Sequence, residues 1–293
     1  MTSVSAPPVR GFLRLVMIEH SIFALPFAYV AALTAMQPRV QWRTLLLITV
    51  AMVAARTVAM AANRIIDRRI DAQNPRTAQR ELVTGAVSLR SAWTGLVVSL
   101  TVFLISAGLL GWLCLLLSPI ALFFLTIYSY AKRFTDFPQV FLGLAQAIAP
   151  IGAWIGVTGR WSWTGFVLGL AVGAWIGGFD CIYACQDADV DARIGVRSVP
   201  VRFGIAGALR AAAVVHVLTV GLFVLFGVLA GLGWLWFTGV ALVAGILVYE
   251  HSIVRPGDLS RVNRAFFTAN GVIGIVLFLF ALADLLVLQH LHL

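Results

Sequence analysis

The sequence predicts an all-α membrane protein, a bundle of nine transmembrane helices, and its composition and the length of its apolar runs carry this prediction. Hydrophobic residues make up 61% of the 293 positions, charged residues make up 11%, and the mean hydropathy is +0.96. Soluble domains of this length do not reach such a balance. A helix needs about 20 apolar residues to cross the roughly 30 Å hydrocarbon core of a bilayer, so nine spans use nearly the whole chain. We therefore expect one transmembrane domain over residues 1–293.

The spans are placed by apolar runs that end at Pro, Gly or charged residues. They lie near residues 12–36, 43–67, 91–111, 113–131, 138–158, 163–187, 204–231, 233–249 and 265–288. The connections after the second and the sixth span are the longest, and functional residues gather on loops. We expect the functional site at these two connections.

The basic residues predict the orientation. Of the 21 Lys and Arg residues, 17 fall on the side of the N-terminus, Arg56 lies inside the second span, and the other side has only Arg39, Arg43 and Arg160. Because cytoplasmic loops carry the excess of positive charge, we expect the N-terminus and the functional site to face the cytoplasm from the inner (plasma) membrane. The net charge of +9 is also typical of nucleic acid binding. Since the basic residues lie in loops between spans, a lipid bilayer and an anionic substrate are the favoured partners, and no nucleic acid is expected.

A first acidic cluster ends the second span in the segment NRIIDRRID. Its polar residues Asn63, Asp67 and Asp71 are spaced four apart, which stacks their side chains on one face of a helix. Three oxygen ligands then point the same way.

A second acidic cluster ends the sixth span in the segment DCIYACQDADVD. Asp180, Asp187 and Asp191 follow one another at spacings of seven and four, so a regular helix would place them on one face too. Asp189 falls off this face, and we expect it to be solvated.

Oxygen-only ligand sets of this kind favour Mg²⁺, which bridges carboxylates and the phosphate oxygens of a substrate. Two such sets facing each other would hold a diphosphate. Each carboxylate buried in a bilayer without a cation costs about 2.5 kcal/mol or more, so uncompensated clustering is not expected by chance. The alternative interpretation is that both clusters are ordinary cytoplasmic helix ends paired with neighbouring arginines.

Basic and aromatic residues near the clusters are candidates for substrate contacts. Arg76 and Arg80 follow Asp71 by five and nine residues, and arginine binds phosphate in a bidentate manner. In the segment YSYAKRFTDFPQ, the residues Tyr130, Lys132 and Arg133 sit where the chain leaves the membrane. The retention of positive charge in cytoplasmic loops and an interfacial aromatic belt would explain the same residues.

The segments NRIIDRRIDAQNPRTAQREL and DCIYACQDADVDARIGVRSVP, with KRFTDFPQ between them, resemble the signature motifs of the UbiA superfamily of intramembrane aromatic prenyltransferases. The resemblance is to the 4-hydroxybenzoate polyprenyltransferase type, and the start IEHSIFALPFAY is similar to menaquinone-pathway members. It implies a nine-helix bundle around a central cavity and Mg²⁺-dependent transfer of a polyprenyl group from polyprenyl diphosphate to an aromatic acid in quinone biosynthesis. It implies catalytic roles for Asp67, Asp71, Asp187 and Asp191, which with Asn63 would hold the metal. It also implies substrate contacts from Asn63, Arg76, Arg80, Tyr130, Lys132, Arg133, Tyr183, Gln186 and Ser198.

The chain departs from the family pattern at two places. Glu81 and Val83 stand where proline is common in the first loop, and Glu19, His20 and Ser21 replace the arginine and proline usual in the first span of 4-hydroxybenzoate enzymes. The aromatic acceptor is therefore open between 4-hydroxybenzoate and a dihydroxynaphthoate. His20 is either an acceptor contact or a polar packing residue.

Two other classes of protein compete with this interpretation. A membrane transporter would also use intramembrane carboxylates, and Pro26, Pro119 and Pro150 could mark broken helices. A transporter does not explain why the acids cluster at two cytoplasmic helix ends. Phosphoalcohol transferases of phospholipid synthesis also bind Mg²⁺ with paired aspartate motifs, but the Asp-Gly pair and the Ala-Arg of their motif are absent here.

Overall fold

The computed structural model describes residues 11–12, 15–16, 25–264, 271–288 and 291–292. Within these residues the regular secondary structure is helical, with turns and loops between the helices, and no strand longer than an isolated bridge is present. The expectation of an all-α protein is confirmed for the described part of the chain.

Seven described helices are long and apolar enough to cross a membrane, and two apolar helices are shorter. The long helices are α3 (Trp42–Asp71), α5 (Leu89–Leu110), α6 (Trp112–Phe134), α7 (Pro138–Thr158), α8 (Trp163–Ala184), α10 (Val199–Ala230) and α11 (Trp234–Ile253). The shorter apolar helices are α2 (Leu25–Ala35) and α13 (Gly271–Val287), and short connecting helices are α4 (Glu81–Thr84), η2 (Cys185–Asp187), α9 (Ala188–Ile194) and α12 (Val262–Arg264). Each predicted span therefore contains a described helix. The first and the ninth span reach into residues outside the description, so nine membrane crossings stay a prediction.

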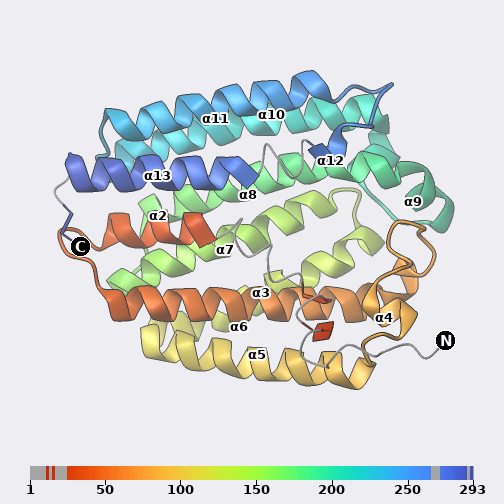
Figure 1. Ribbon diagram of the computed structural model, residues 1–293, viewed down its shortest axis with the longest axis horizontal. Coiled ribbons are helices and arrows are strands. Elements are labelled where there is room, and N and C mark those ends of the chain that lie inside the picture. The colour runs from red at the N-terminus through yellow and green to blue at the C-terminus, as the bar shows by residue number, and fades with distance from the viewer. Residues whose placement is uncertain (1–10, 13–14, 17–24, 265–270, 289–290, 293) are drawn as a thin grey trace.

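The apolar helices lie side by side, with α10, α11 and α13 on one flank, α5 and α6 on the other, and α7 and α8 between them (Figure 1). Helix α8 packs against both α7 and α10. The α7–α8 contact requires glycine, because a Cβ atom at Gly143 would lie 2.5 Å from the carbonyl oxygen of Gly173. Small residues of this kind let transmembrane helices approach closely.

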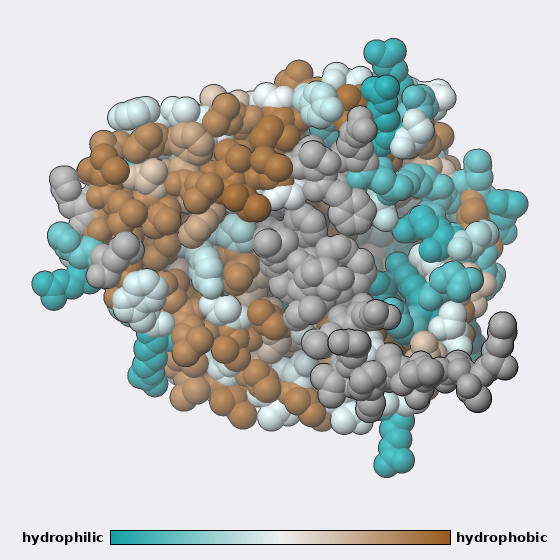
Figure 2. All heavy atoms as spheres, in the orientation of Figure 1, coloured by the Kyte–Doolittle hydropathy of each residue, from teal (hydrophilic) through white to brown (hydrophobic). Residues whose placement is uncertain are grey.

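The surface divides into an apolar belt and a polar end. Hydrophobic side chains cover the left part of the face in Figure 2, and hydrophilic side chains gather at the opposite end, where α4 and α9 lie (Figures 1 and 2). Large apolar side chains are exposed along the helices, among them Val214, Val217 and Val248. Exposed apolar surface of this extent marks contact with lipid. The chain is a multi-pass membrane protein.

Three predicted boundaries differ from the structure in ways that affect the site. Helix α3 continues one turn beyond residue 67 and ends at Asp71, so the whole first cluster is helical. The sixth span ends in η2, a 3₁₀ turn, instead of continuing as a regular helix. Helix α10 begins with a short helical segment from Val199, and the chain kinks at Gly204, which takes a φ of +72°, where the predicted span begins.

The helices that contain proline are continuous. Pro119 lies inside α6 and Pro150 lies inside α7, and both helices run on beyond these residues. The interpretation of these prolines as marks of broken helices, which the transporter hypothesis used, is wrong for α6 and α7. Pro26 lies in the first turn of α2, as far as that helix is described, where proline is tolerated.

Candidate active site

A cavity of about 1160 Å³ opens between α3, α5, α6, α7 and α8. Most of its wall is apolar, with Phe103, Leu117, Phe124, Ile148, Trp175 and Phe179 among the lining residues. Its polar lining residues near the C-terminal ends of α3 and α8 include Asn63, Arg76, Arg80, Asp180 and Tyr183. Typical pockets for small ligands enclose about 300–1000 Å³, so this cavity has room for a long apolar molecule with a polar head.

The first acidic cluster, Asn63, Asp67 and Asp71, lies at the end of α3, where the four-residue spacing keeps its members on one face. Asn63 donates from Nδ2 to Asp67 Oδ2 at 2.8 Å. Asp67 is buried, and its carboxylate pairs with Lys132 Nζ at 2.7 Å and with a terminal guanidinium nitrogen of Arg133 at 3.1 Å. Both bases come from the last turn of α6.

Asp71 is paired from the loop that follows it. Arg80 donates to both carboxylate oxygens of Asp71, at 2.6 and 2.7 Å. The hydroxyl of Thr77 donates to the backbone carbonyl oxygen of Asp71 at 3.0 Å. These contacts fold the loop back over the end of α3. The phosphate contact expected for Arg80 stays a prediction.

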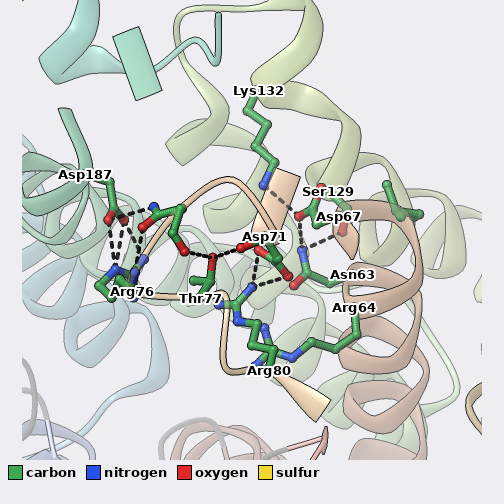
Figure 3. A network of polar contacts seen from close by, with 12 residues as sticks. Asn63, Arg64, Asp67, Asp71, Arg76, Thr77, Arg80, Ser129, Lys132 and Asp187 are labelled. Carbon is green, nitrogen blue, oxygen red and sulfur yellow. Dashed lines mark hydrogen bonds and ion pairs between the residues drawn. The ribbon is translucent and has the colours of Figure 1, made fainter. Parts of the chain in front are cut away.

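Asp187 is held by the same loop. Arg76 Nε donates to its two carboxylate oxygens at 2.9 and 3.1 Å, a terminal nitrogen of Arg76 also contacts Oδ2, and Asn74 Nδ2 donates at 3.1 Å. Arg76 further donates to the Tyr183 hydroxyl at 3.0 Å. Burial lowers the pKa of the Arg76 guanidinium, but its hydrogen bond to Asp187 and the charges of neighbouring groups, Asp191 among them, outweigh this and raise the pKa above the usual value. Figure 3 shows the loop joining Asp187 at one side to Asp71 and Asp67 at the other.

The other two carboxylates of the second acidic cluster (Asp180, Asp187 and Asp191) have different surroundings. Asp180 is half-buried in the wall of the cavity. Asp191 lies half-exposed on α9, beyond the 3₁₀ turn that contains Asp187. The sequence spacing predicted one shared face for Asp180, Asp187 and Asp191 on the assumption of a regular helix. The 3₁₀ turn interrupts that helix before Asp191, so the assumption does not hold for this residue. Asp189 is exposed, as expected.

The remaining predicted residues lie around this centre. Tyr130 is 45% exposed, carries the Arg133 guanidinium over its ring at 5.2 Å, and is not among the residues that line the cavity. Gln186 donates to the Tyr183 carbonyl oxygen at 3.4 Å. Ser198 is buried at the start of α10, and its hydroxyl oxygen has no hydrogen-bond partner in the described part of the chain. His20 lies outside the described residues.

Several polar residues of the site did not follow from the sequence patterns. Asn74 and Thr77 hold the loop through the hydrogen bonds given above. In the sequence, the Asn-Pro pair at positions 74 and 75 indicates a turn and could have identified Asn74. Tyr128 and Arg56 line the cavity deeper between the helices. The Nε atom of Arg56 is buried without a hydrogen-bond partner among the described residues. The signal that could have identified Arg56 was a charge inside a transmembrane segment.

The donor set agrees with a magnesium site that is completed by a substrate. Among the described residues, no three His, Cys, Asp or Glu side chains form a ready-made metal cage. Mg²⁺ does not need one, because it keeps several waters and is held by one or two carboxylates together with substrate phosphate oxygens. Five side chains offer only oxygen as the metal donor, and they are Asn63, Asp67, Asp71, Asp187 and Asp191.

Fold and site together define a class of protein, an integral membrane enzyme with an apolar cavity closed at one end by paired carboxylates and bases. The family model of the UbiA prenyltransferase family matches residues 24–283, and the chain belongs to this family. A 4-hydroxybenzoate octaprenyltransferase of Xanthomonas euvesicatoria is 35% identical over 236 residues, which cover 80% of this chain and 77% of that protein. The chain is therefore a prenyltransferase of the UbiA family, as the sequence motifs predicted, and the relative named here is of the 4-hydroxybenzoate type.

Solved structures show the same fold. The apo structure of a UbiA homolog from Aeropyrum pernix superposes with a TM-score of 0.83 at 36% identity and covers 91% of this chain and 98% of its own. A UbiA homolog from Archaeoglobus fulgidus, bound to GPP and Mg²⁺, superposes with a TM-score of 0.74 at 21% identity and covers 94% and 100%.

Proposed function

We propose that this prenyltransferase transfers a polyprenyl group from a polyprenyl diphosphate to an aromatic acid, of the 4-hydroxybenzoate or dihydroxynaphthoate type, in quinone biosynthesis, and that it depends on Mg²⁺. One observation carries the proposal. Two clusters of carboxylates face the same loop, whose Arg76 and Arg80 each bind one cluster, next to the opening of a large apolar cavity. A diphosphate head and a polyprenyl tail match these two parts.

The diphosphate would enter where the loop now closes on the carboxylates. Arg76 and Arg80 are partly exposed and can exchange a carboxylate oxygen for a phosphate oxygen. Lys132 lies beside Asp67 and adds a further positive charge. Mg²⁺ held by Asn63, Asp67, Asp71, Asp187 and Asp191 would make diphosphate a better leaving group.

The apolar cavity suits the rest of the reaction. The bond between the first prenyl carbon and the diphosphate oxygen breaks, the electron pair leaves with diphosphate, and the electron-rich aromatic ring attacks the allylic carbon. Walls such as Phe124, Trp175 and Phe179 would exclude the water that otherwise quenches an allylic cation. The aromatic face of Tyr183 stands at the boundary between head and tail and can stabilise positive charge.

An acid is favoured as the acceptor by Arg56. Its guanidinium lies in the cavity wall with a buried, unpaired Nε within the described structure. A buried charge is costly unless it is paired, and the carboxylate of an aromatic acid would supply the missing partner. A neutral phenol would leave this cost in place.

We further propose one transmembrane domain over residues 1–293, inserted in the inner (plasma) membrane with the site and the N-terminus on the cytoplasmic side. The distribution of basic residues supports this orientation. The basic side chains of the site, Arg76, Arg80, Lys132 and Arg133, lie at the same ends of α3, α6 and α8 as the acidic clusters.

The test is an assay of purified protein in detergent with Mg²⁺, a polyprenyl diphosphate, and a panel of acceptors that includes 4-hydroxybenzoate and a dihydroxynaphthoate. We expect prenylated product and released diphosphate, no turnover after chelation of Mg²⁺, and no turnover in Asp67→Ala or Asp187→Ala. Asp189→Ala, which changes an exposed carboxylate of the same segment, serves as the matched control. If the two site variants keep wild-type turnover, the metal-binding assignment is wrong.

A further inference from the structure

Asp180 differs from the other acids of the site in where its carboxylate lies. It sits in the last two turns of α8 and lines the cavity together with Phe179, Tyr183 and Trp175. The buried carboxylates of Asp67, Asp71 and Asp187 lie beyond the cavity wall. Asp180 therefore stands where the apolar cavity meets its charged end.

Asp180 also differs in its partners. Asp67, Asp71 and Asp187 are each bound by at least one arginine or lysine. Within the described residues, no hydrogen bond or ion pair engages the Asp180 carboxylate, although Arg76, Lys132, Asp187 and Asp191 are near enough to act on it electrostatically. Its oxygens remain free to accept a proton.

The reaction under "Proposed function" needs such an acceptor, and the inference rests on that function. When the ring carbon next to the hydroxyl group forms a bond with the prenyl carbon, diphosphate leaves with the electron pair. The ring must then lose the hydrogen of that carbon as a proton to become aromatic again. In a cavity that excludes water, the proton has to pass to a base inside the site, either the released diphosphate or a carboxylate of the cavity wall.

We propose that Asp180 is a catalytic residue of this chain and accepts the ring proton of the aromatic acceptor. The carboxylate takes the proton and becomes a carboxylic acid, the C–H electron pair restores the aromatic ring, and the proton then passes to solvent at the charged end of the cavity. Glu81, the other acid among the described lining residues, begins α4 and does not belong to α8, where Asp180 lies beside Phe179 and Tyr183.

The experiment compares Asp180→Asn, Asp180→Glu and the control Asp189→Asn with wild type. Each is assayed with 4-hydroxybenzoate and with 4-hydroxybenzoate that carries deuterium at both ring positions beside the hydroxyl group. In wild type, prenyl transfer is expected to limit the rate, so both acceptors give the same kcat. In Asp180→Asn, we expect kcat to fall by about 10²-fold or more, with an unchanged KM for the polyprenyl diphosphate and a lower kcat for the deuterated acceptor. A structural role would not create this isotope effect.

Asp180→Glu keeps a carboxylate but displaces it by one methylene group, so it should give an intermediate kcat. If Asp180→Asn does not purify as a folded protein, Asp180→Glu is the test variant, and the isotope effect is then expected in Asp180→Glu. The proposal is overturned if the assayed variant keeps wild-type kcat, or if its kcat falls equally for both acceptors. If wild type prenylates 4-hydroxybenzoate and Asp180→Asn is equally active, only this inference is overturned and the proposed function stands. Wild type that prenylates no aromatic acid overturns the proposed function as well.

Discussion

The two acidic clusters occupy equivalent helix ends, yet their structures differ. The first, on α3, is one regular helical face in which Asp67 and Asp71 are buried and paired with bases from α6 and from the following loop. The second, on α8 and beyond, passes through a 3₁₀ turn and spreads its carboxylates over three environments: a cavity wall at Asp180, a buried ion pair at Asp187 and a half-exposed helix at Asp191.

The comparison shows that two clusters with the same kind of acidic side chain can differ in how firmly their carboxylates are held. Breaking a buried ion pair leaves an uncompensated charge at a cost of about 3–5 kcal/mol, so the first cluster is tied to the stability of the fold. The second cluster has carboxylates that are free of direct partners within the described residues and can respond to a substrate. We expect the first cluster to behave as a fixed part and the second as an adaptable part of the site.

The largest expected effect separates these two behaviours. Asp71→Asn and Asp191→Asn should each lower kcat/KM by about 10³-fold, equivalent to about 4 kcal/mol of transition-state stabilisation. Only Asp71→Asn should also lower the melting temperature in detergent, because it breaks the buried pair with Arg80. Thermal unfolding of both variants beside the activity assay checks this. Equal melting temperatures would contradict the contrast between a fixed and an adaptable cluster.

The next effect concerns charge deeper along α3. Arg56→Gln should raise the KM for the aromatic acid by about tenfold to 100-fold, because a hydrogen bond to a charged group contributes about 1.5–3 kcal/mol. The KM for the polyprenyl diphosphate should stay the same. Steady-state kinetics with each substrate varied in turn measures both constants. If only the KM for the polyprenyl diphosphate rises, Arg56 binds the diphosphate and not the aromatic acid, and the prediction is wrong.

A smaller effect is expected at the loop that connects the clusters. Arg76→Lys keeps the charge but loses the bidentate contact to Asp187 and the stacking of the guanidinium on Tyr183 at 5.1 Å. The KM for the polyprenyl diphosphate should rise by about tenfold, a loss of about 1.4 kcal/mol. Arg193→Lys is the control, since Arg193 lies exposed on α9 and donates to a backbone oxygen of its own helix. If both variants bind the diphosphate equally, the loop does not recognise it through Arg76.

The smallest effect is expected at Tyr130. This residue is half-exposed and lies outside the cavity lining, so Tyr130→Phe should leave kcat and both KM values within about twofold, as surface substitutions commonly do. Tyr128→Phe is the informative partner, because the Tyr128 ring lines the cavity. If Tyr130→Phe lowers kcat or raises a KM by much more than about twofold, Tyr130 contacts the substrate, as the sequence motif implied.

Much of the site could be predicted where the chain is locally regular. The four-residue spacing placed Asn63, Asp67 and Asp71 on one face because α3 stays a regular helix through all three. The same argument is incomplete for Asp187 and Asp191, because a 3₁₀ turn changes the rise and rotation per residue. Periodicity carries no information about where such a turn occurs.

The sequence by itself determined that the chain is an apolar multi-helix membrane protein and that its motifs are those of a prenyltransferase family, and it picked out two acidic helix ends as the candidate site. These properties depend on composition and local spacing. Only the tertiary structure decided that Lys132 pairs with Asp67, that Arg76 reaches Asp187 across 111 positions of the chain, and that Asp180 faces the cavity. The physical reason is that ion pairing and access to a cavity depend on how the helices pack, and packing is set by contacts between residues distant in sequence.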